Sequence, residues 1–268
     1  MVFERFLSAN PLLTMNHKIK RYGWIPDLPD HRDFTYAAPM EIAAALPSKV
    51  DLRPQCPPVY DQGQLGSCTA NSIAGAHEFE QMKQNKPDVF VPSRLFIYYN
   101  ERVIEGSVKS DSGAQIRDGI KSIASQGVCP ETEWPYVITK FATKPPAQAF
   151  KDAKNNAAVS YQGIVQSLNQ FKGCLASGYP FVFGFAVYES FESPVVAKTG
   201  NAPMPASGEQ ALGGHAVMAV GYNDTAQRFI VRNSWGPTWG QKGYFTLPYA
   251  YLTDPNLASD FWTIRLVN

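Results

Sequence analysis

This sequence has almost no excess of positive over negative charge and no long hydrophobic run. It also contains little cysteine and histidine. Its 268 residues include 24 Lys and Arg against 23 Asp and Glu, so the net charge is only +1. A chain this close to neutral lacks the basic surface that nucleic acid or an anionic membrane attracts, so neither partner is expected. No apolar run approaches the roughly 18 residues that span a bilayer.

The first residues, Met1 to Ser8, hold too short an apolar stretch for a secretory signal. The expected location is therefore the cytoplasm, or outside the cell by a route that needs no such signal.

The sequence contains four cysteines and four histidines. No two of these residues have the spacing of metal ligands, so no metal and no cofactor are expected. If one cysteine is a free nucleophile, three remain, and they allow at most one disulfide. This low content is compatible with a reducing compartment. The four cysteines are Cys56, Cys68, Cys129 and Cys174.

The segment from Asp61 to Asn71 carries the strongest chemical signal. It places Gln62 six positions before Cys68, and a helical pattern follows at once, with Ser67 as its expected N-cap. Cys68 would then stand in the first turn of a helix, where unpaired amides and the helix dipole lower the pKa of a thiol. A lone cysteine is more often a buried apolar residue, so this segment is not sufficient by itself.

Two later residues complete a catalytic pattern. His215 opens a strand-like run, and Asn233 ends the next one, with turn residues between them. The order Cys, His, Asn is that of a thiol nucleophile, its base and the group that orients the base. Taken singly, Asn233 is better explained as a turn residue and Gln62 as a solvated polar residue. Together with Cys68 and His215, they indicate catalysis. The other histidines, His17, His31 and His77, are not expected to be catalytic.

These segments resemble the signature blocks of the papain family of cysteine peptidases. The blocks are Gln62-Gly63 with Ser67-Cys68, Gly214-His215-Ala216, and Asn233-Ser234-Trp235-Gly236. Leu46 to Arg53 resembles the start of the family's mature enzyme, and Gly127 to Tyr136 resembles a mid-chain block. The cysteine and histidine are 215 − 68 = 147 residues apart, within the separation of about 130–150 that is typical of the family.

The sequence also departs from the family pattern. Leu65 stands where the family has a second cysteine, and Thr69 stands where it has an aromatic residue after the nucleophile. The first change removes a family disulfide, and the second alters the packing behind the nucleophile. Both indicate a divergent member, of bacterial or viral type, rather than a lysosomal one.

The resemblance implies thiol-dependent hydrolysis of peptide bonds through a thioacyl-enzyme on Cys68. His215 would be the acid and base, Asn233 would orient its ring, and Gln62 would stabilise the oxyanion with the backbone amide of Cys68. Trp235 would shield the bond between the histidine and the asparagine from water.

Polypeptides bound in extended form are the implied substrates, paired through backbone to the cleft. The expected substrate-binding residues are Gly113, Gly214, Ala216 and Trp235. Gly113 has an equally simple explanation as a residue that begins a helix. A subsite pocket is expected to include Ala216 and part of Leu252 to Asp260. The sequence does not distinguish an endopeptidase from an exopeptidase.

The order of elements indicates an α+β protein with two lobes. Helical patterns dominate residues from about 46 to 145, and alternating patterns such as Pro180 to Tyr188 dominate from about 160 to 268. Pro145-Pro146 marks a crossover between them, and 194–212 is expected to be a surface excursion. The resemblance implies a papain-like fold, with a helical N-terminal lobe, an antiparallel β-sheet C-terminal lobe and the active site in the cleft between them.

Residues 1–45 differ from the peptidase domain expected at 46–268. They are rich in proline and charge, and Tyr22 to Phe34 is their most patterned part. Two interpretations are open: an irregular arm packed on the domain, or a short pro-segment that lies across the cleft and restrains the enzyme, as in a zymogen. Family members usually carry a longer helical pro-domain, and its periodicity is not present here.

Two other functions stay open. The chain could be a catalytically silent or latent homologue that binds peptides, or an acyl transferase that uses the same thiol. Transferases with the Cys and His order usually complete it with Asp, so Gln62 and Asn233 favour a peptidase. The presence of all four catalytic residue types speaks against a silent homologue.

Overall fold

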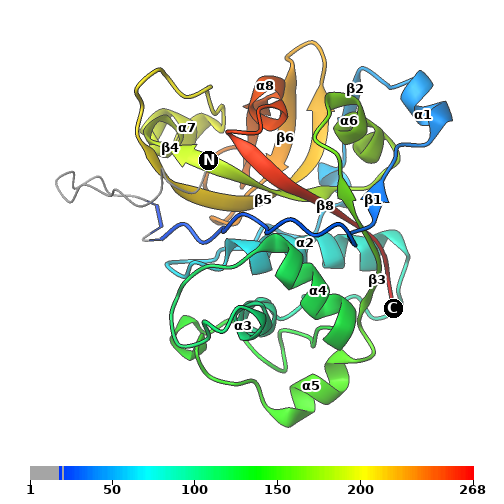
Figure 1. The fold of residues 1–268 in the computed structure, drawn as a ribbon, viewed down its shortest axis with the longest axis vertical. Coiled ribbons are helices and arrows are strands. Elements are labelled where there is room, and N and C mark those ends of the chain that lie inside the picture. The colour runs from blue at the N-terminus through cyan, green and yellow to red at the C-terminus, as the bar shows by residue number, and fades with distance from the viewer. Residues whose placement is uncertain (1–17, 20) are drawn as a thin grey trace.

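The computed structural model describes residues 18, 19 and 21–268, so His17 lies outside the described residues. The sheet lies in one lobe, most of the long helices lie in the other, and helix α2 runs along the boundary between them (Figure 1). The helices are α1 (Met40–Ala44), α2 (Cys68–Lys83), α3 (Arg94–Ile104), α4 (Ile116–Gln126), α5 (Ala147–Ala153), α6 (Leu168–Ala176), α7 (Pro194–Thr199) and α8 (Tyr249–Thr253). The strands are β1 (Thr35–Tyr36), β2 (Lys49–Asp51), β3 (Ala158–Ile164), β4 (Phe181–Tyr188), β5 (Ala211–Asn223), β6 (Arg228–Arg232), β7 (Tyr244–Pro248) and β8 (Ala258–Val267).

Among the described residues the sheet has the order β1-β3-β8-β4-β5-β6-β7, and β2 pairs with β5. Every pairing is antiparallel except that of β1 with β3, in which Thr35 lies opposite Gly163. The α+β prediction, with helices first and an antiparallel sheet later, is confirmed. The one parallel pair comes from the N-terminal segment, which joins the sheet after it has crossed the molecule.

Strand β4 shows why the sheet lobe holds together. Its residues alternate as predicted, but both faces are buried, from Phe181 to Val187. Phe181 and Phe183 pack with Phe261 on one side, with ring centroids 6.1 and 5.7 Å apart. On the other side Gly184 faces the indole ring of Trp24. The N-terminal segment thus covers part of a surface that would otherwise be open.

Helix α2 is buried on all sides for most of its length, from Cys68 to Gln81. It lies between β5 and β8 on one side and α3 and α4 on the other. Ser67 occupies the N-cap position, but its side chain accepts no backbone amide there. Its hydroxyl instead contacts the hydroxyl of Tyr136 and accepts a hydrogen bond from Asn71 Nδ2 at 3.1 Å. The predicted side-chain cap is therefore wrong, because neighbouring side chains take the same oxygen.

The predicted crossover and the predicted surface excursion each contain a short helix that was not expected. Helix α5 lies in the crossover after Pro146, and α7 opens the expected surface excursion. Ser193 caps α7 by accepting from Val196 N at 3.3 Å, and Gly200 ends it in the left-handed conformation, at φ 67°. Serine before proline and a following glycine are ordinary helix boundary signals, which were available in the sequence.

All four cysteines lie in the described part of the chain, and all are free thiols. No helix of the described residues is both long and apolar enough to cross a membrane.

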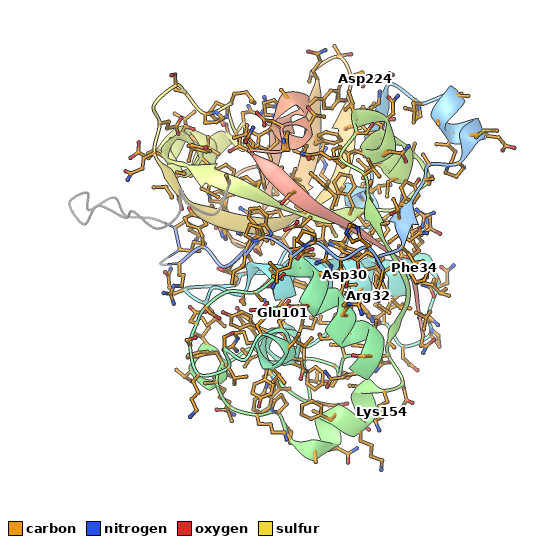
Figure 2. All side chains as sticks on the ribbon, in the orientation of Figure 1. Asp30, Arg32, Phe34, Glu101, Lys154 and Asp224 are labelled. Atoms are coloured by element: carbon orange, nitrogen blue, oxygen red, sulfur yellow. The ribbon has the colours of Figure 1, made fainter. Side chains whose placement is uncertain are left out.

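The N-terminal segment, residues 18–38 without the undescribed residue 20, is called the arm below. It runs between the sheet lobe and helices α2 and α4 before it reaches β1, as the dark blue trace of Figure 1 shows. Figure 2 labels Asp30, Arg32 and Phe34 along it.

Candidate active site

Cys68 is the first residue of α2, and its side chain is fully buried. Burial raises the pKa of the thiol to about 12, although hydrogen bonds from the backbone amides of Ala216 and Gly23 oppose the rise. The predicted lowering of the pKa is wrong for this state of the protein. The helix terminus is present, but the arm residue Gly23 covers the sulfur and excludes the water that would stabilise a thiolate.

His215 and Asn233 form the hydrogen bond that their spacing in the sequence suggested. His215 Nε2 lies 2.8 Å from Asn233 Oδ1, and that oxygen also accepts from Ser234 N at 2.9 Å. Because the asparagine oxygen only accepts, Nε2 carries the proton and Nδ1 is left as a base. Within the described residues, Nδ1 is buried and has no hydrogen-bond partner.

The imidazole is fully enclosed. Trp235, only 1% exposed, stacks on it with ring centroids 5.0 Å apart and an interplanar angle of 28°. Burial lowers the pKa of His215 to about 4, and the bond to Asn233 offsets part of that change. At neutral pH both the thiol of Cys68 and the ring of His215 are therefore uncharged in this structure.

Gln62 is fixed beside these residues by both ends of its amide. Its Nε2 donates to Leu65 O at 3.0 Å, and its Oε1 accepts from Ser234 Oγ at 2.6 Å. Its own backbone N–H donates to Ser234 O at 2.9 Å. Because Nε2 makes one of its two possible hydrogen bonds to Leu65 O, its second N–H stays available. Gln62 is fully buried, so this N–H lies in a site shielded from water. Ser234, which sequence reasoning did not single out as a functional residue, connects Gln62 to Asn233, because its hydroxyl donates to Gln62 Oε1 and its backbone N–H donates to Asn233 Oδ1.

The arm fills the cleft next to the sulfur and pairs with both lobes. Ala114 N donates to Gly23 O at 2.8 Å, and Ile25 N donates to Ala114 O at 3.0 Å. Trp24 N donates to Gly214 O at 2.9 Å on the sheet side. The pairing in the helical lobe thus uses the backbone of Ala114, one residue after the predicted Gly113.

Gly113 has a different place in this contact. A Cβ on Gly113 would lie 2.2 Å from Gly23 O, and a Cβ on Gly23 would lie 1.8 Å from Gly66 O. Both glycines are therefore required for the close approach of two backbones. Of the other predicted substrate-binding residues, Gly214 touches the arm through its carbonyl, and Ala216 touches the sulfur through its amide.

The side chain of Trp24 occupies a pocket beside the nucleophile. Its walls include Gly184 and Gly214, on which a Cβ would lie 1.9 and 2.5 Å from indole atoms. At its end, Trp24 Nε1 donates to Asp260 Oδ2 at 2.9 Å. Asp260 falls within the segment 252–260 that was expected to line a subsite pocket. Sequence reasoning placed Trp24 only within the patterned part of residues 1–45 and could not pair it with a residue 236 positions away.

A buried acid behind the nucleophile was also missed. Thr69, which replaces the family's aromatic residue, donates from Oγ1 to Glu101 Oε2 at 2.9 Å. Glu101 lies on α3 below the arm in Figure 2 and is fully buried. Burial raises its pKa well above the ordinary value, so it is uncharged, and its charge would raise the pKa of Cys68. The threonine was a visible signal, but its partner was not.

The remaining histidines lie elsewhere. His77 is buried in the second half of α2, where its Nδ1 is 3.1 Å from Gln81 Nε2, and burial lowers its pKa to about 4. His31 is exposed on the arm.

Comparisons with known proteins give the family and the fold of this chain. The papain family cysteine protease model matches residues 46–252. The chain belongs to the papain family of cysteine proteases. An uncharacterized peptidase C1-like protein of Acanthamoeba polyphaga mimivirus is 47% identical over 272 residues, covering 92% of this chain and 88% of the viral protein. Chymopapain of Carica papaya is 28% identical over 234 residues, covering 81% of this chain and 58% of chymopapain.

Solved structures of the papain family share the fold. The crystal structure of xylellain, a cysteine protease from Xylella fastidiosa, has a TM-score of 0.88 at 48% identity and covers 92% of this chain and 96% of its own. Procathepsin B from Trypanosoma congolense, at 17% identity, shows the fold alone, with a TM-score of 0.71 over 92% of this chain and 86% of its own. The predicted family and the papain-like two-lobe fold are confirmed.

The buried acid behind Cys68 gives a testable pH dependence of stability. Its pKa is raised in the folded state, so it stabilises the fold fully below its unfolded value of 4.5 and less as the pH rises. Glu101→Gln keeps an acceptor for Thr69 and removes that loss. Urea unfolding should show equal stability at low pH and a variant more stable by at least about 1 kcal/mol at alkaline pH.

The matched control is Glu41→Gln, which changes an exposed glutamate of α1. A difference between wild type and Glu101→Gln that does not change with pH would contradict an uncharged Glu101.

Proposed function

We propose that this papain-family protease hydrolyses peptide bonds through a thioacyl-enzyme on Cys68, and that the arm restrains it. His215 is the acid and base, Asn233 orients its ring, and Gln62 belongs to the oxyanion hole. The observation that carries the proposal is the bond from His215 Nε2 to Asn233 Oδ1 at 2.8 Å, which leaves Nδ1 as the free base. The Cys68 sulfur, from which Nδ1 would take the proton, lies against the backbone amide of Ala216, the residue that follows His215.

The chemistry follows from these positions once a substrate replaces the arm. His215 Nδ1 takes the thiol proton, and the sulfur attacks the carbonyl carbon. The free N–H of Gln62 and the backbone amide of Cys68 donate to the oxyanion that develops. The imidazolium then protonates the leaving amine, and the neutral ring later takes a proton from the water that hydrolyses the thioester. Asn233 holds the ring in one orientation throughout.

Polypeptides in extended form suit the cleft, because both of its sides offer backbone groups. The arm shows that a chain can pair with Ala114 on one side and with Gly214 on the other. Gly113 and Ala216 border this path, and Trp235 supports it from behind the imidazole. We assign residues 46–268 to the peptidase domain, with a helical lobe at about 46–145 and a sheet lobe at about 160–268 that share the cleft.

The arm would act as a restraint because it occupies the cleft in a form that cannot react. The sulfur receives the N–H of Gly23 and so faces an amide nitrogen rather than a carbonyl carbon. The indole of Trp24 fills the neighbouring pocket, and Tyr22 lies against His215 with ring centroids 6.2 Å apart. Burial under these residues also keeps both catalytic groups uncharged. This full enclosure is the state expected of a latent enzyme.

The catalytic assignment is tested in a chain whose arm has been displaced by Gly23→Val. In that background, adding His215→Ala should abolish labelling of Cys68 by a thiol-reactive epoxide. Adding Gln62→Ala should lower kcat for a peptide substrate by about 10²–10³, the usual cost of one oxyanion donor. Labelling that survives the loss of His215, or a kcat that is unchanged without Gln62, would contradict these roles.

The restraint is tested by adding bulk to the arm. Any Cβ at position 23 meets Gly66 O, so Gly23→Val should expel the arm and raise the rate of Cys68 labelling about tenfold or more. The matched control is Ala37→Val, which adds a similar volume at an exposed position of the arm. Equal labelling rates in Gly23→Val, Ala37→Val and wild type would show that the arm does not restrain the thiol.

A further inference from the structure

Two carboxylates meet where the arm leaves the cleft, one from each side of the interface. Asp260 of β8 accepts at Oδ2 from Trp24 Nε1 at 2.9 Å and from Asp27 N at 2.8 Å. Asp27 of the arm accepts in return from Trp262 Nε1 at 2.8 Å and from Arg117 N at 3.1 Å. Each carboxylate is thus held by groups of the opposite partner, and the charge of Asp260 acts on Asp27.

Strand β8 is shaped to bring Asp260 to this place. Its register with β4 shifts between the pairs Val182–Trp262 and Gly184–Ser259, so that the strand bulges. Asp260 sits in the bulge at φ 59°, a left-handed conformation that aspartate tolerates better than most residues. The bulge turns its carboxylate toward the arm.

We propose that Asp27 and Asp260 form a proton-dependent latch that holds the arm in the cleft in acid and weakens its hold as the pH rises toward neutrality. This inference rests on the proposed restraint of the enzyme by the arm. It adds to that restraint the condition that releases it and the pair of residues that senses the condition.

Nearby positive charge offsets only part of the repulsion between the pair, because Arg117 lowers the pKa of both carboxyls but burial raises both by more. Arg117 of α4 lies nearest, but its Nε already binds Asp33 Oδ2 of the arm at 2.7 Å. Lys121, one turn further along α4, binds Asp30 at 3.0 Å and Asp33 at 3.5 Å. Both cations of this helix are therefore engaged with other arm carboxylates, which leaves Asp27 and Asp260 to repel each other when both are ionised.

The sign of the effect follows from this arrangement. Burial, and after it the charge of Asp260, raises the pKa of Asp27 from 3.8 to about 7 in the docked arm. A released arm returns Asp27 to water and to its ordinary pKa. At a pH between 3.8 and about 7, docking of the arm therefore takes up one proton on Asp27. The arm is bound most strongly below pH 3.8, and its binding weakens as the pH rises toward 7. Because one proton is taken up, the equilibrium constant for docking falls by at most about tenfold per pH unit.

Amide hydrogen exchange on the full chain tests the latch without using catalysis. The chain carries Cys68→Ser to prevent self-cleavage, and protection is read on residues 22–28, whose amides at Trp24, Ile25 and Asp27 are bonded to the domain. After correction for intrinsic exchange, protection should fall at least about tenfold between pH ~5 and pH ~8. Asp27→Asn keeps the shape but only one of the two oxygens that accept from Arg117 N and Trp262 Nε1, so docking should be weaker at every pH. The fall in protection with pH should be clearly smaller than in the parent, because only Asp260, whose pKa burial also raises, still titrates.

Two comparisons make the result specific. Asp30→Asn also removes an arm carboxylate, but one that binds Arg32 and Lys121, so it should weaken docking while the pH dependence persists. Protection of α2 reports whether each variant is folded, and Asp260→Asn serves as the second variant if Asp27→Asn is not.

Flat protection in the parent, or an equal fall in Asp27→Asn, would overturn the latch. Failure of Gly23→Val to expose Cys68 would instead remove the restraint and leave the pH dependence of docking standing.

Discussion

The approach of the Gly23 backbone to the floor of the cleft is the contact on which this structure depends. Its amide hydrogen bonds to the sulfur of Cys68, its carbonyl accepts from Ala114, and its α-carbon faces the carbonyl of Gly66 with no room for a side chain. A single glycine therefore lets an extended segment lie directly on Cys68, the proposed nucleophile. The positions of Trp24 in its pocket and of Asp27 against Asp260 follow from it.

The electrostatic state of the site is a consequence of that contact. A papain-type site needs a thiol and an imidazole that can exchange a proton, and solvent stabilises the charged pair. With the arm in place, burial raises the pKa of Cys68 and lowers the pKa of His215, so the neutral forms of both groups are favoured. In the proposed mechanism, Asn233 and Ser234 hold the imidazole and Gln62 in place while the arm is bound, and only the charged form of the thiol and imidazole is missing. This separation would let release of the arm activate the enzyme without refolding the site.

Much of the fold could be predicted because it depends on local patterns. The strand from Phe181 to Tyr188 and the helix after Cys68 follow from periodicity, and their order gives the α+β class. The helix at Pro194–Thr199 was missed although Ser193 and Gly200 mark its ends. The cap by Ser67 was expected from a local rule, but Tyr136 and Asn71, brought in by the tertiary fold, take its hydroxyl.

The candidate site likewise has features that local sequence patterns predict and features that depend on the tertiary fold. Motif order was enough to propose Cys68, His215, Asn233 and Gln62 as site residues, and the structure brings the last three together through Ser234. The lowered thiol pKa was expected from the helix terminus alone, which ignores what covers the sulfur. The contacts of Trp24 and Asp27 with Asp260 join residues that are 236 and 233 positions apart in the sequence. No spacing rule connects such positions, so only the fold reveals them.

The most direct test of the account is the ionisation of Cys68 in the intact chain, read as thiolate absorbance against a Cys68→Ser reference. Burial raises the pKa of Cys56, Cys129 and Cys174 as well, so the difference reports Cys68. At about pH 6, where a papain-type thiol with a lowered pKa would be ionised, the account predicts no thiolate in the intact chain and a clear thiolate signal after Gly23→Val. A full thiolate signal in the intact chain at that pH would contradict it.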